Sequence, residues 1–193
     1  LEHGKKINDR SGMGAALDNI GGIYKEKGDY GEAIQHHLQS LEIRKEINDR
    51  QGMAGCLDNI AIAYAMQDKY EQAIENFKKS LSIAKETGNL LRTARTLGNI
   101  GECYSDWKKY QKAEEYLLES IRIGRQIDAK NELIRVYQNL ANVYAQQRDF
   151  EKAYENINLY IGINDTVYSE ESSKTIAELQ TKFETNKKEK ENE

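Results

Sequence analysis

Four asparagines recur at intervals of forty residues and form the most regular set of hydrogen-bonding side chains in the sequence. Each amide can donate two hydrogen bonds and accept others, so it can bind polar groups of a ligand or bridge to a neighbouring helix. Two arginines share this spacing, and guanidinium groups on adjacent rungs could together clamp a carboxylate. The residues are Asn19, Asn59, Asn99 and Asn139, with Arg95 and Arg135.

Other reactive side chains do not form a recognisable catalytic or metal-binding pattern. The sequence contains no GxxxxGK, HExxH, GxSxG or CxxC motif. His36 and His37 are adjacent, so on a helix they point in different directions, and His37 takes the position that Phe77 holds in the next repeat. Cys56 and Cys103 occupy different positions of the repeat and are interpreted as packing residues. We therefore expect no catalytic residue, no cofactor site and no metal site, and we predict that the chain is not an enzyme.

The composition favours an elongated helical protein. Proline is absent, charged residues make up 31% of the 193 residues, and the apolar fraction is 38%. The net charge of −4 is small, and no basic stripe could neutralise a row of phosphates, which argues against a nucleic-acid partner. The longest apolar run, from Ile60 to Met66, is far shorter than the roughly 20 residues of a membrane-spanning helix.

A repeat of forty residues organises the whole sequence. Shifting the chain by forty aligns Tyr24 with Tyr64 and Ala33 with Ala73, and four such copies are typical of a stacked repeat array. Within a copy, two apolar stripes with helical spacing are separated by a short polar turn, so each copy is predicted to be a pair of antiparallel helices. The predicted helices are 11–27, 30–47, 51–67, 70–87, 91–107, 110–127, 130–147 and 150–166.

The pattern Leu57-x-x-Ile60-Ala61-x-x-Tyr64, followed by Ala73-x-x-x-Phe77, resembles the tetratricopeptide repeat. The resemblance implies an all-α fold, a right-handed solenoid of helix hairpins, with repeats at about 11–50, 51–90, 91–130 and 131–166. The period of forty exceeds the family's usual 34, and the family's closing proline is replaced by Lys45, Lys85 and Arg125. Without proline the second helix can continue for another turn.

Both ends of the sequence depart from the complete repeat. Residues 1–10 match residues 41–50 at seven of ten positions, so they are predicted to be the second helix of a truncated preceding repeat. Apolar surface around Ile7 and Leu17 should then lie open, which predicts weak homo-oligomerisation through the N-terminal edge. Residues 167–193 are predicted to form a capping helix that begins near Ser169, followed by a charged helical connector.

The helix stripe through Leu57, Ile60 and Tyr64 should face the second helix, so residues about 100° away should line the concave groove. The resemblance implies that the asparagines there bind the backbone of a peptide; the alternative is that they only bridge neighbouring helices. Aspartates in the first two repeats and arginines in the last two predict a groove that prefers acidic ligand residues over Arg95 and Arg135. The predicted groove residues are Asp18, Asn19, Asp58, Asn59, Arg95, Asn99, Glu102, Arg135, Gln138, Asn139 and Asn142.

The function implied by the resemblance is binding of a protein or peptide. Forty-residue versions of the repeat occur in bacterial signalling proteins, and the stretch from Ala177 onward resembles the linker that follows such repeats in bacterial sensor proteins. We therefore expect the sensory or regulatory region of a bacterial signal-transduction protein, periplasmic if it belongs to a membrane sensor kinase and cytoplasmic otherwise. A free-standing adaptor or scaffold, and a non-catalytic part of a larger enzyme, are the alternatives.

Overall fold

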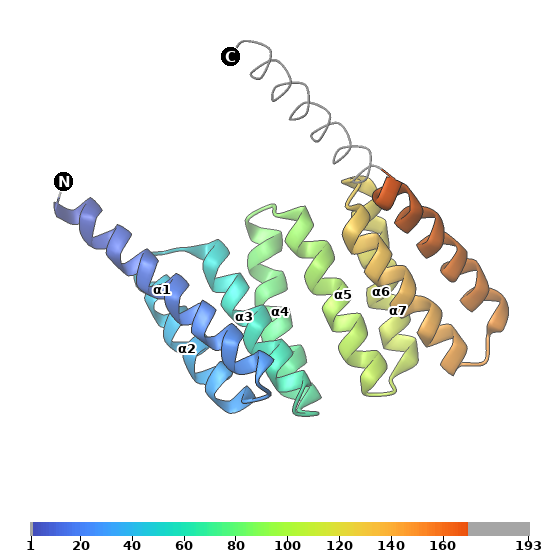
Figure 1. The fold of residues 1–193 in the computed structure, drawn as a ribbon, viewed down its shortest axis with the longest axis horizontal. Coiled ribbons are helices and arrows are strands. Elements are labelled where there is room, and N and C mark those ends of the chain that lie inside the picture. Colours follow the sequence, from blue (N-terminus) through green and yellow to red (C-terminus); the bar gives the residue numbers. More distant parts are fainter. Residues whose placement is uncertain (1, 170–193) are drawn as a thin grey trace, which may run out of the picture.

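The computed structural model describes residues 2–169, and these residues form helices joined by short turns (Figure 1). The described part of the chain contains no strand, which confirms the all-α prediction. None of its helices is long and apolar enough to cross a membrane. The helices are α1 (Glu2–Glu26), α2 (Tyr30–Glu46), α3 (Arg50–Ala65), α4 (Tyr70–Glu86), α5 (Leu90–Asp106), α6 (Tyr110–Gln126) and α7 (Lys130–Gln146), and a last helix begins at residue 150 and is described to residue 169.

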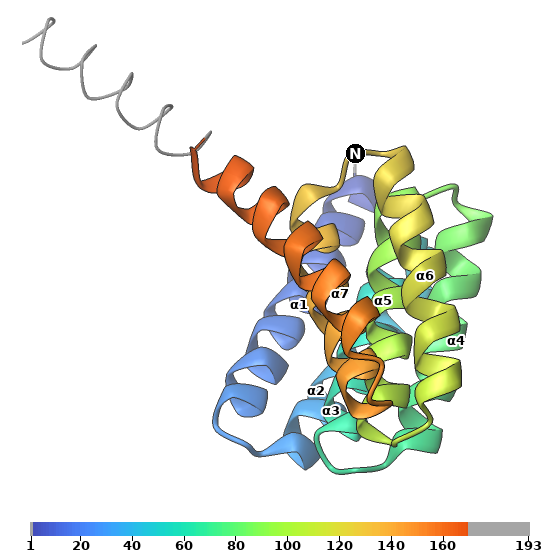
Figure 2. The same ribbon diagram turned by 90° about the vertical axis from the view of Figure 1, so that its right-hand side faces the viewer.

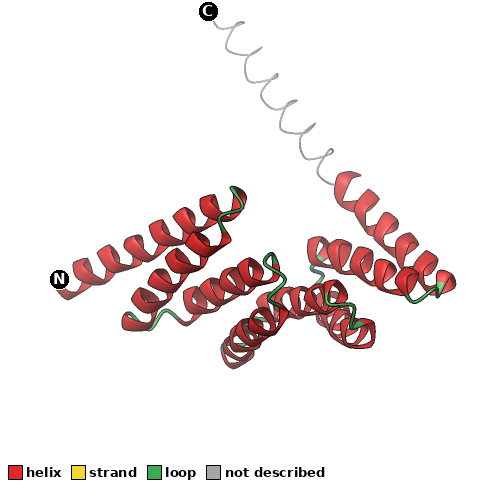
Figure 3. Ribbon diagram, turned by 90° about the horizontal axis from the view of Figure 1, so that it is seen from below, coloured by secondary structure: helices red, strands yellow, loops and turns green. Residues whose placement is uncertain are grey.

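Successive hairpins stack into a curved array, as Figure 3 shows. Each helix from α1 to α7 packs against the next one in the chain. The first helices of neighbouring hairpins also contact each other, α1 with α3, α3 with α5 and α5 with α7, whereas α2, α4 and α6 make no such contacts with one another. The odd-numbered helices are therefore closer together and form the inner, concave side of the curve. This arrangement confirms the predicted solenoid of helix hairpins.

Small residues lie where the two helices of a hairpin approach most closely. A Cβ atom added to Gly21 would come within 2.8 Å of the His37 ring, and one added to Gly101 would come within 2.6 Å of Leu117 Cγ. Ala61 occupies the same position in the second repeat and is fully buried. A larger side chain at these positions would force the helices apart, so the small residues set the spacing within the hairpin.

The side chains considered for chemistry in the sequence are largely part of the core. His37 is 1% exposed and fills the position that Phe77 fills in the second hairpin, as predicted. Cys56 and Cys103 are buried free thiols, which confirms their interpretation as packing residues. Burial raises the pKa of Cys56 to about 11 and that of Cys103 to about 12, so neither thiol is ionised at neutral pH.

The turns between the helices all contain one residue in the left-handed region. The N–H of the residue that follows donates to the carbonyl five positions back, as from Asp29 to Tyr24 and from Asn89 to Ala84, both at 2.9 Å. This bond satisfies a carbonyl at the end of the helix and reverses the chain in three residues. The left-handed residues recur every twenty positions: Gly28, Asn48, Asp68, Gly88, Lys108, Asp128 and Arg148.

The N-terminal prediction of a separate helix is wrong. Residues 2–10 do not end in a turn before residue 11; they continue into the first repeat as one helix, α1. The same Asn-Asp-Arg sequence forms a turn at residues 48–50, where Asn48 has a φ of 56° and helices α2 and α3 pack against each other. At Asn8 the same sequence lies inside α1, and the chain does not reverse there.

The last helix closes the described array. Ala153, Tyr160 and Ile163 pack against the main core, and the helix lies beside α7 in Figure 2. The predicted end of this helix at residue 166 is not observed, because the helix continues to residue 169, and Thr166 Oγ1 donates back to the Gly162 carbonyl within it at 2.9 Å. The predicted capping helix and charged connector fall mainly on residues 170–193 and so lie outside the described residues.

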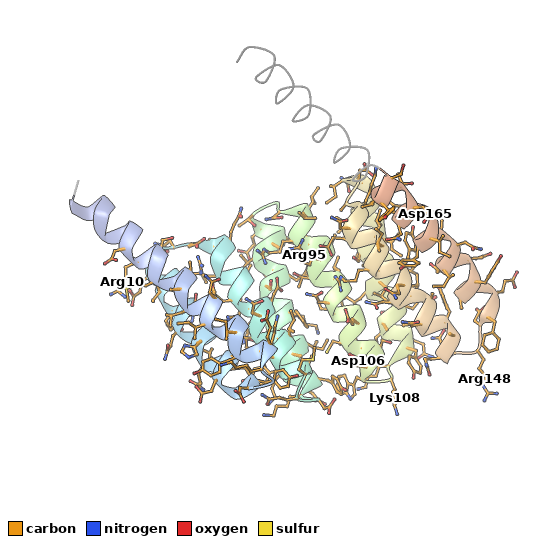
Figure 4. All side chains as sticks on the ribbon, viewed as in Figure 1. Arg10, Arg95, Asp106, Lys108, Arg148 and Asp165 are labelled. Carbon is orange, nitrogen blue, oxygen red and sulfur yellow. The ribbon has the colours of Figure 1, made fainter. Side chains whose placement is uncertain are left out.

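The turn geometry generates a stability prediction. Gly88 has a φ of 65°, and a Cβ atom placed there would meet no atom within 4 Å. Gly88→Ala should therefore lower the free energy of unfolding by about 1 kcal/mol through backbone strain alone. The reverse change, Arg148→Gly, should raise it by up to about 1 kcal/mol, because Arg148 has a φ of 63° and projects from its turn (Figure 4). Urea denaturation would measure both, and equal effects of the same sign would contradict the prediction.

Candidate functional site on the concave face

Two adjoining hollows lie on the concave face between the first helices. The first, of about 180 Å³, lies between α3 and α5, and the second, of about 510 Å³, lies between α5 and α7. Glu102 and Asp106 of α5 line both hollows and so form the ridge that separates them. The other lining residues are Ile62, Ala65, Met66, Phe77, Asn99 and Cys103 in the first, and Ser105, Lys108, Tyr110, Asn139, Asn142 and Gln146 in the second.

The repeated asparagines have different surroundings. Asn99 lines the first hollow, and Asn139 lines the second together with Asn142. Asn139 Nδ2 donates to Glu102 Oε2 at 3.2 Å, so this amide bridges α7 to α5. Asn59 is half-buried on α3, and Asn19 is exposed on α1. Asn139 therefore bridges two helices, as one of the two alternatives has it, while Asn99 faces a hollow, and its contact with a peptide stays a prediction.

The two arginines pair with carboxylates of their own groove. Arg95 Nε lies 2.6 Å from Glu132 Oε1, and Arg135 lies 2.9 Å from Glu102 and 3.3 Å from Glu132. These four residues form a ladder of alternating charge across α5 and α7, which we call the Arg–Glu ladder. Its arginines are already compensated, so they attract a ligand carboxylate less than free guanidinium groups would. Sequence analysis missed Glu132, although its spacing of i, i+3 from Arg135 is a helical ion-pair signal.

Asp58 is not a groove residue, and this prediction is wrong. Its side chain is buried between α3 and α5, with the residue only 5% exposed. Arg92 Nη1 donates to its carboxylate at 2.9 Å, and Thr96 Oγ1 does so at 3.1 Å. Burial raises the pKa of Asp58, while the bonds from its partners oppose this rise. The carboxylate holds two neighbouring repeats together and is inaccessible to a ligand.

Asp18 is engaged in a similar way one repeat earlier. His37 Nδ1 lies 3.1 Å from its Oδ1, and Arg44 Nη2 lies 3.0 Å from its Oδ2. Burial alone would raise the pKa of Asp18, but hydrogen bonds from His37, Cys56 and Arg44 hold it below the usual value. Both aspartates and both arginines are paired with other side chains of the protein, so the charges on which the predicted gradient from an acidic to a basic groove depends are largely compensated. Gln138 is exposed on α7.

The ridge between the hollows carries a carboxylate that has no ion-pair partner among the described residues. Glu102 accepts from Arg135, whereas no hydrogen bond or ion pair links Asp106 to another side chain among the described residues. Burial raises the pKa of Asp106, and the nearby charges of Glu102 and Asp68 raise it further. Figure 4 shows Arg95 and Asp106 toward opposite ends of α5. The ladder and the unpaired carboxylate thus occupy different parts of the groove.

Comparison with protein-family models gives one match, to the tetratricopeptide repeat. The match covers three overlapping ranges, 12–86, 53–126 and 92–158. These ranges include the four predicted repeats almost completely, and they contain both hollows of the concave face. The family supports a protein-interaction module. A comparison with curated protein sequences found no match.

Solved structures with a similar fold include BtubC from P. vanneervenii and two Rap-type proteins. BtubC is 18% identical, with a TM-score of 0.71, over 80% of this chain and 64% of its own. Aspartyl phosphate phosphatase F from Bacillus subtilis is 21% identical, with a TM-score of 0.78, over 82% of this chain and 42% of its own. A Rap protein complexed with competence and sporulation factor is 18% identical, with a TM-score of 0.73, over 82% of this chain and 43% of its own. The chain thus spans less than two thirds of each of these proteins, and the likeness concerns the fold.

The buried position of Asp58 predicts a large effect for its partner. Arg92→Ala leaves the carboxylate buried without its charged partner and should lower the free energy of unfolding by about 3 kcal/mol at neutral pH. Because loss of Arg92 raises the Asp58 pKa further above 3.8, the folded state then favours the protonated acid. The loss of stability should be smallest near about pH 4 and should increase as the pH rises through the raised pKa.

The control for Arg92→Ala is Arg50→Ala, which removes an ion pair with Glu86 between α3 and α4 whose side chains are 47% and 55% exposed. This change should cost less than about 1 kcal/mol. Urea denaturation at several pH values would measure both variants. Equal losses, or a loss for Arg92→Ala that does not vary with pH, would contradict the structural role of Asp58.

Proposed function

We propose that this chain, which belongs to the tetratricopeptide repeat family, binds an extended segment of a partner protein in the groove formed by α3, α5 and α7. The observation that carries this proposal is the pair of adjoining hollows on the concave face. A solenoid presents such a face as one continuous surface, and a groove of this kind suits an elongated ligand better than a compact one.

The amides of the groove supply the contacts that an extended backbone needs. An extended peptide exposes alternating N–H and C=O groups, and the amide of Asn99 or Asn142 can donate to one and accept from the other. Neither asparagine makes a side-chain hydrogen bond that fixes it to another described residue, whereas Asn139 is engaged with Glu102. Asn99 and Asn142 are therefore two asparagines of the groove that are available to a ligand.

The proposed context is the sensory or regulatory region of a bacterial signal-transduction protein. Support comes from the Rap-type structures of similar fold, one of which was solved with competence and sporulation factor. The alternatives are an adaptor or scaffold and a non-catalytic part of a larger enzyme. The enzyme alternative is supported by one solved structure of similar fold, which is named as an aspartyl phosphate phosphatase. The gene sequence upstream and downstream of the stretch that encodes these residues would decide among the three contexts. An apolar run of about 20 residues would favour a membrane sensor, and a catalytic domain would favour the enzyme.

The role that we propose for the chain itself is non-catalytic. The thiols of Cys56 and Cys103 are buried and protonated, and His37 is enclosed beside Asp18. In the groove, the side chains of Ser105, Lys108 and Tyr110 line the second hollow, and none of them forms a hydrogen bond with another described side chain that would pair a nucleophile with a base. Nucleophilic catalysis by a protein side chain depends on such a pair.

We also propose weak self-association through α1, with a different set of residues from the one predicted. Leu17 is half-buried, whereas Met13, Ile20 and Ile23 are 47%, 39% and 52% exposed. These three residues fall on one side of α1, and in later repeats Ile60 and Ile100 occupy the position of Ile20 and are buried. The exposed side of α1 is thus a surface that the repeat normally covers, and such apolar patches favour association.

Removal of one groove amide tests the binding proposal. Asn99→Ala should weaken binding of peptides of varied sequence about 2- to 10-fold, because each lost amide–backbone hydrogen bond contributes about 0.5–1.5 kcal/mol. The matched control is Asn76→Ala on α4, where Nδ2 donates only to the Gln72 carbonyl of its own helix. Retention of a random octapeptide library on the immobilised chain, quantified by mass spectrometry, would measure the difference. Equal retention by wild type and both variants would place binding outside the groove.

Self-association has its own test. Ile20→Asp with Ile23→Asp places two charges on the exposed side of α1 and should abolish any concentration-dependent dimer. Leu118→Asp on α6, where Leu118 is 46% exposed, is the control and should leave the dimer unchanged. Sedimentation velocity over a range of concentrations would report the association. A dimer that survives the double substitution would show that α1 is not the interface.

A further inference from the structure

We infer that the groove selects a basic peptide, one that carries an apolar residue beside a lysine or arginine. The inference rests on the proposed function, because it names the chemistry of a ligand for the same groove. It replaces the acidic ligand that the sequence predicted. Two features carry it: an apolar hollow of limited size, and an acidic ridge at its edge.

The first hollow can receive one apolar side chain. Its floor includes Phe77 and Cys103, each 2% exposed, and Ile62 and Met66 stand on its α3 side. Met66 is 59% exposed, which is unusual for a methionine in an otherwise well-packed array. The volume of about 180 Å³ is close to that of cavities of about 150 Å³ that bind a benzene-sized group. A leucine, methionine or phenylalanine side chain would cover this exposed surface.

The carboxylates at the edge of the hollow favour a positive charge on the ligand residue beside the apolar one. Glu102 and Asp106 line it from α5, and Asp106 has no ion-pair partner among the described residues. A cation placed between the two carboxylates would relieve the repulsion between them and gain a charge-assisted hydrogen bond. The arginines of the groove offer no equal site for an anion, since Glu132 and Glu102 already occupy them.

The acidic ridge is specific to the third repeat. The positions of Glu102 and Asp106 are held by glycine and glutamate in the first repeat, isoleucine and methionine in the second, and asparagine and glutamine in the fourth: Gly22 and Glu26, Ile62 and Met66, Asn142 and Gln146. Only this repeat therefore places two carboxylates on the concave face, and they adjoin the apolar residues that the second repeat contributes.

Lys108 is the cation that lines the second hollow, and it does not cancel the ridge. It lies in the turn after α5, beyond the end of that helix in Figure 4, and no ion pair joins it to Asp106 among the described residues. A ligand that crosses from α3 to α7 would place its apolar side chain in the first hollow and its basic side chain on the ridge. Asn99, in the wall of the same hollow, would then contact the ligand backbone.

The experiment compares four pools of capped octapeptides on the immobilised full chain. Each pool has a fixed central pair, Leu-Lys, Leu-Glu, Leu-Gln or Ser-Lys, and random residues elsewhere. The Leu-Lys pool should be retained about 2- to 5-fold more than the Leu-Gln pool, the range expected for a partly exposed ion pair. The Leu-Glu pool should be retained less than the Leu-Gln pool. The Ser-Lys pool should be retained less than the Leu-Lys pool, because serine does not fill the apolar hollow.

Three variants assign the preference to the ridge. Asp106→Asn should remove most of the advantage of Leu-Lys over Leu-Gln, measured as the ratio of the retention of the two pools on the same variant. Asp106→Lys should reverse the order, so that Leu-Glu exceeds Leu-Lys. The control Glu75→Gln changes the net charge equally on α4, outside both hollows, where Glu75 pairs with Lys79 at 2.6 Å, and it should leave the order of the pools unchanged.

The outcomes separate this inference from the proposed function. Retention that falls with Asn99→Ala but does not distinguish Leu-Lys from Leu-Glu would overturn the basic preference and leave groove binding intact. A basic preference that persists in Asp106→Asn would place the selecting charge elsewhere and also overturn the inference. Retention of no pool above that of a blank resin would overturn both.

Discussion

Each hairpin depends on a side chain of its second helix that fills the space beside a small residue of its first helix. His37 lies against Gly21 and Leu117 against Gly101 at distances that leave no room for a Cβ atom. This contact brings the two helices close enough to exclude water from between their apolar faces. A single hairpin, however, leaves part of each apolar face uncovered. Stacking of the next hairpin completes the burial, so the curvature and the concave face both follow from one repeated contact.

The polar side chains of the stack fall into two groups with different consequences for function. Asp18 and Asp58 are enclosed, and each joins its repeat to the next through bonds to Cys56 or to Thr96 and Arg92. Such carboxylates require their partners, because an uncompensated charge is costly away from water. They join neighbouring repeats, and Asp58 is only 5% exposed.

The second group lies on the surface and determines what the groove presents. The Arg–Glu ladder ties α5 to α7 and balances the charge of that end of the groove. Near the other end of α5, Asp106 has neighbouring negative charges and no cationic partner among the described residues. Beside it, Met66 and Ile62 expose apolar surface above a buried floor. The balance of charge on the groove surface thus differs between the two ends of α5.

The sequence by itself determined the repeat and its helices. The forty-residue period placed α2 to α7 within one or two residues of their observed bounds, because apolar periodicity and turn residues act locally and recur in each copy. It also located the packed position of His37, since this follows from aligning His37 with Phe77. The helical period does not predict whether a polar side chain contacts a partner on a neighbouring repeat.

Only the tertiary structure decided which polar residues remain available. Asp58 and Arg95 both lie off the apolar stripe, yet Arg92 and Thr96 enclose Asp58, and Glu132 compensates Arg95. Their partners lie more than thirty residues away in the sequence, so the spacing within one helix carries no information about them. The same three-residue sequence also reverses the chain at Asn48 and remains helical at Asn8, so the local sequence alone does not decide between a turn and a helix. The local sequence pattern determines where the helices lie, and contacts between repeats determine which polar side chains remain available to a ligand.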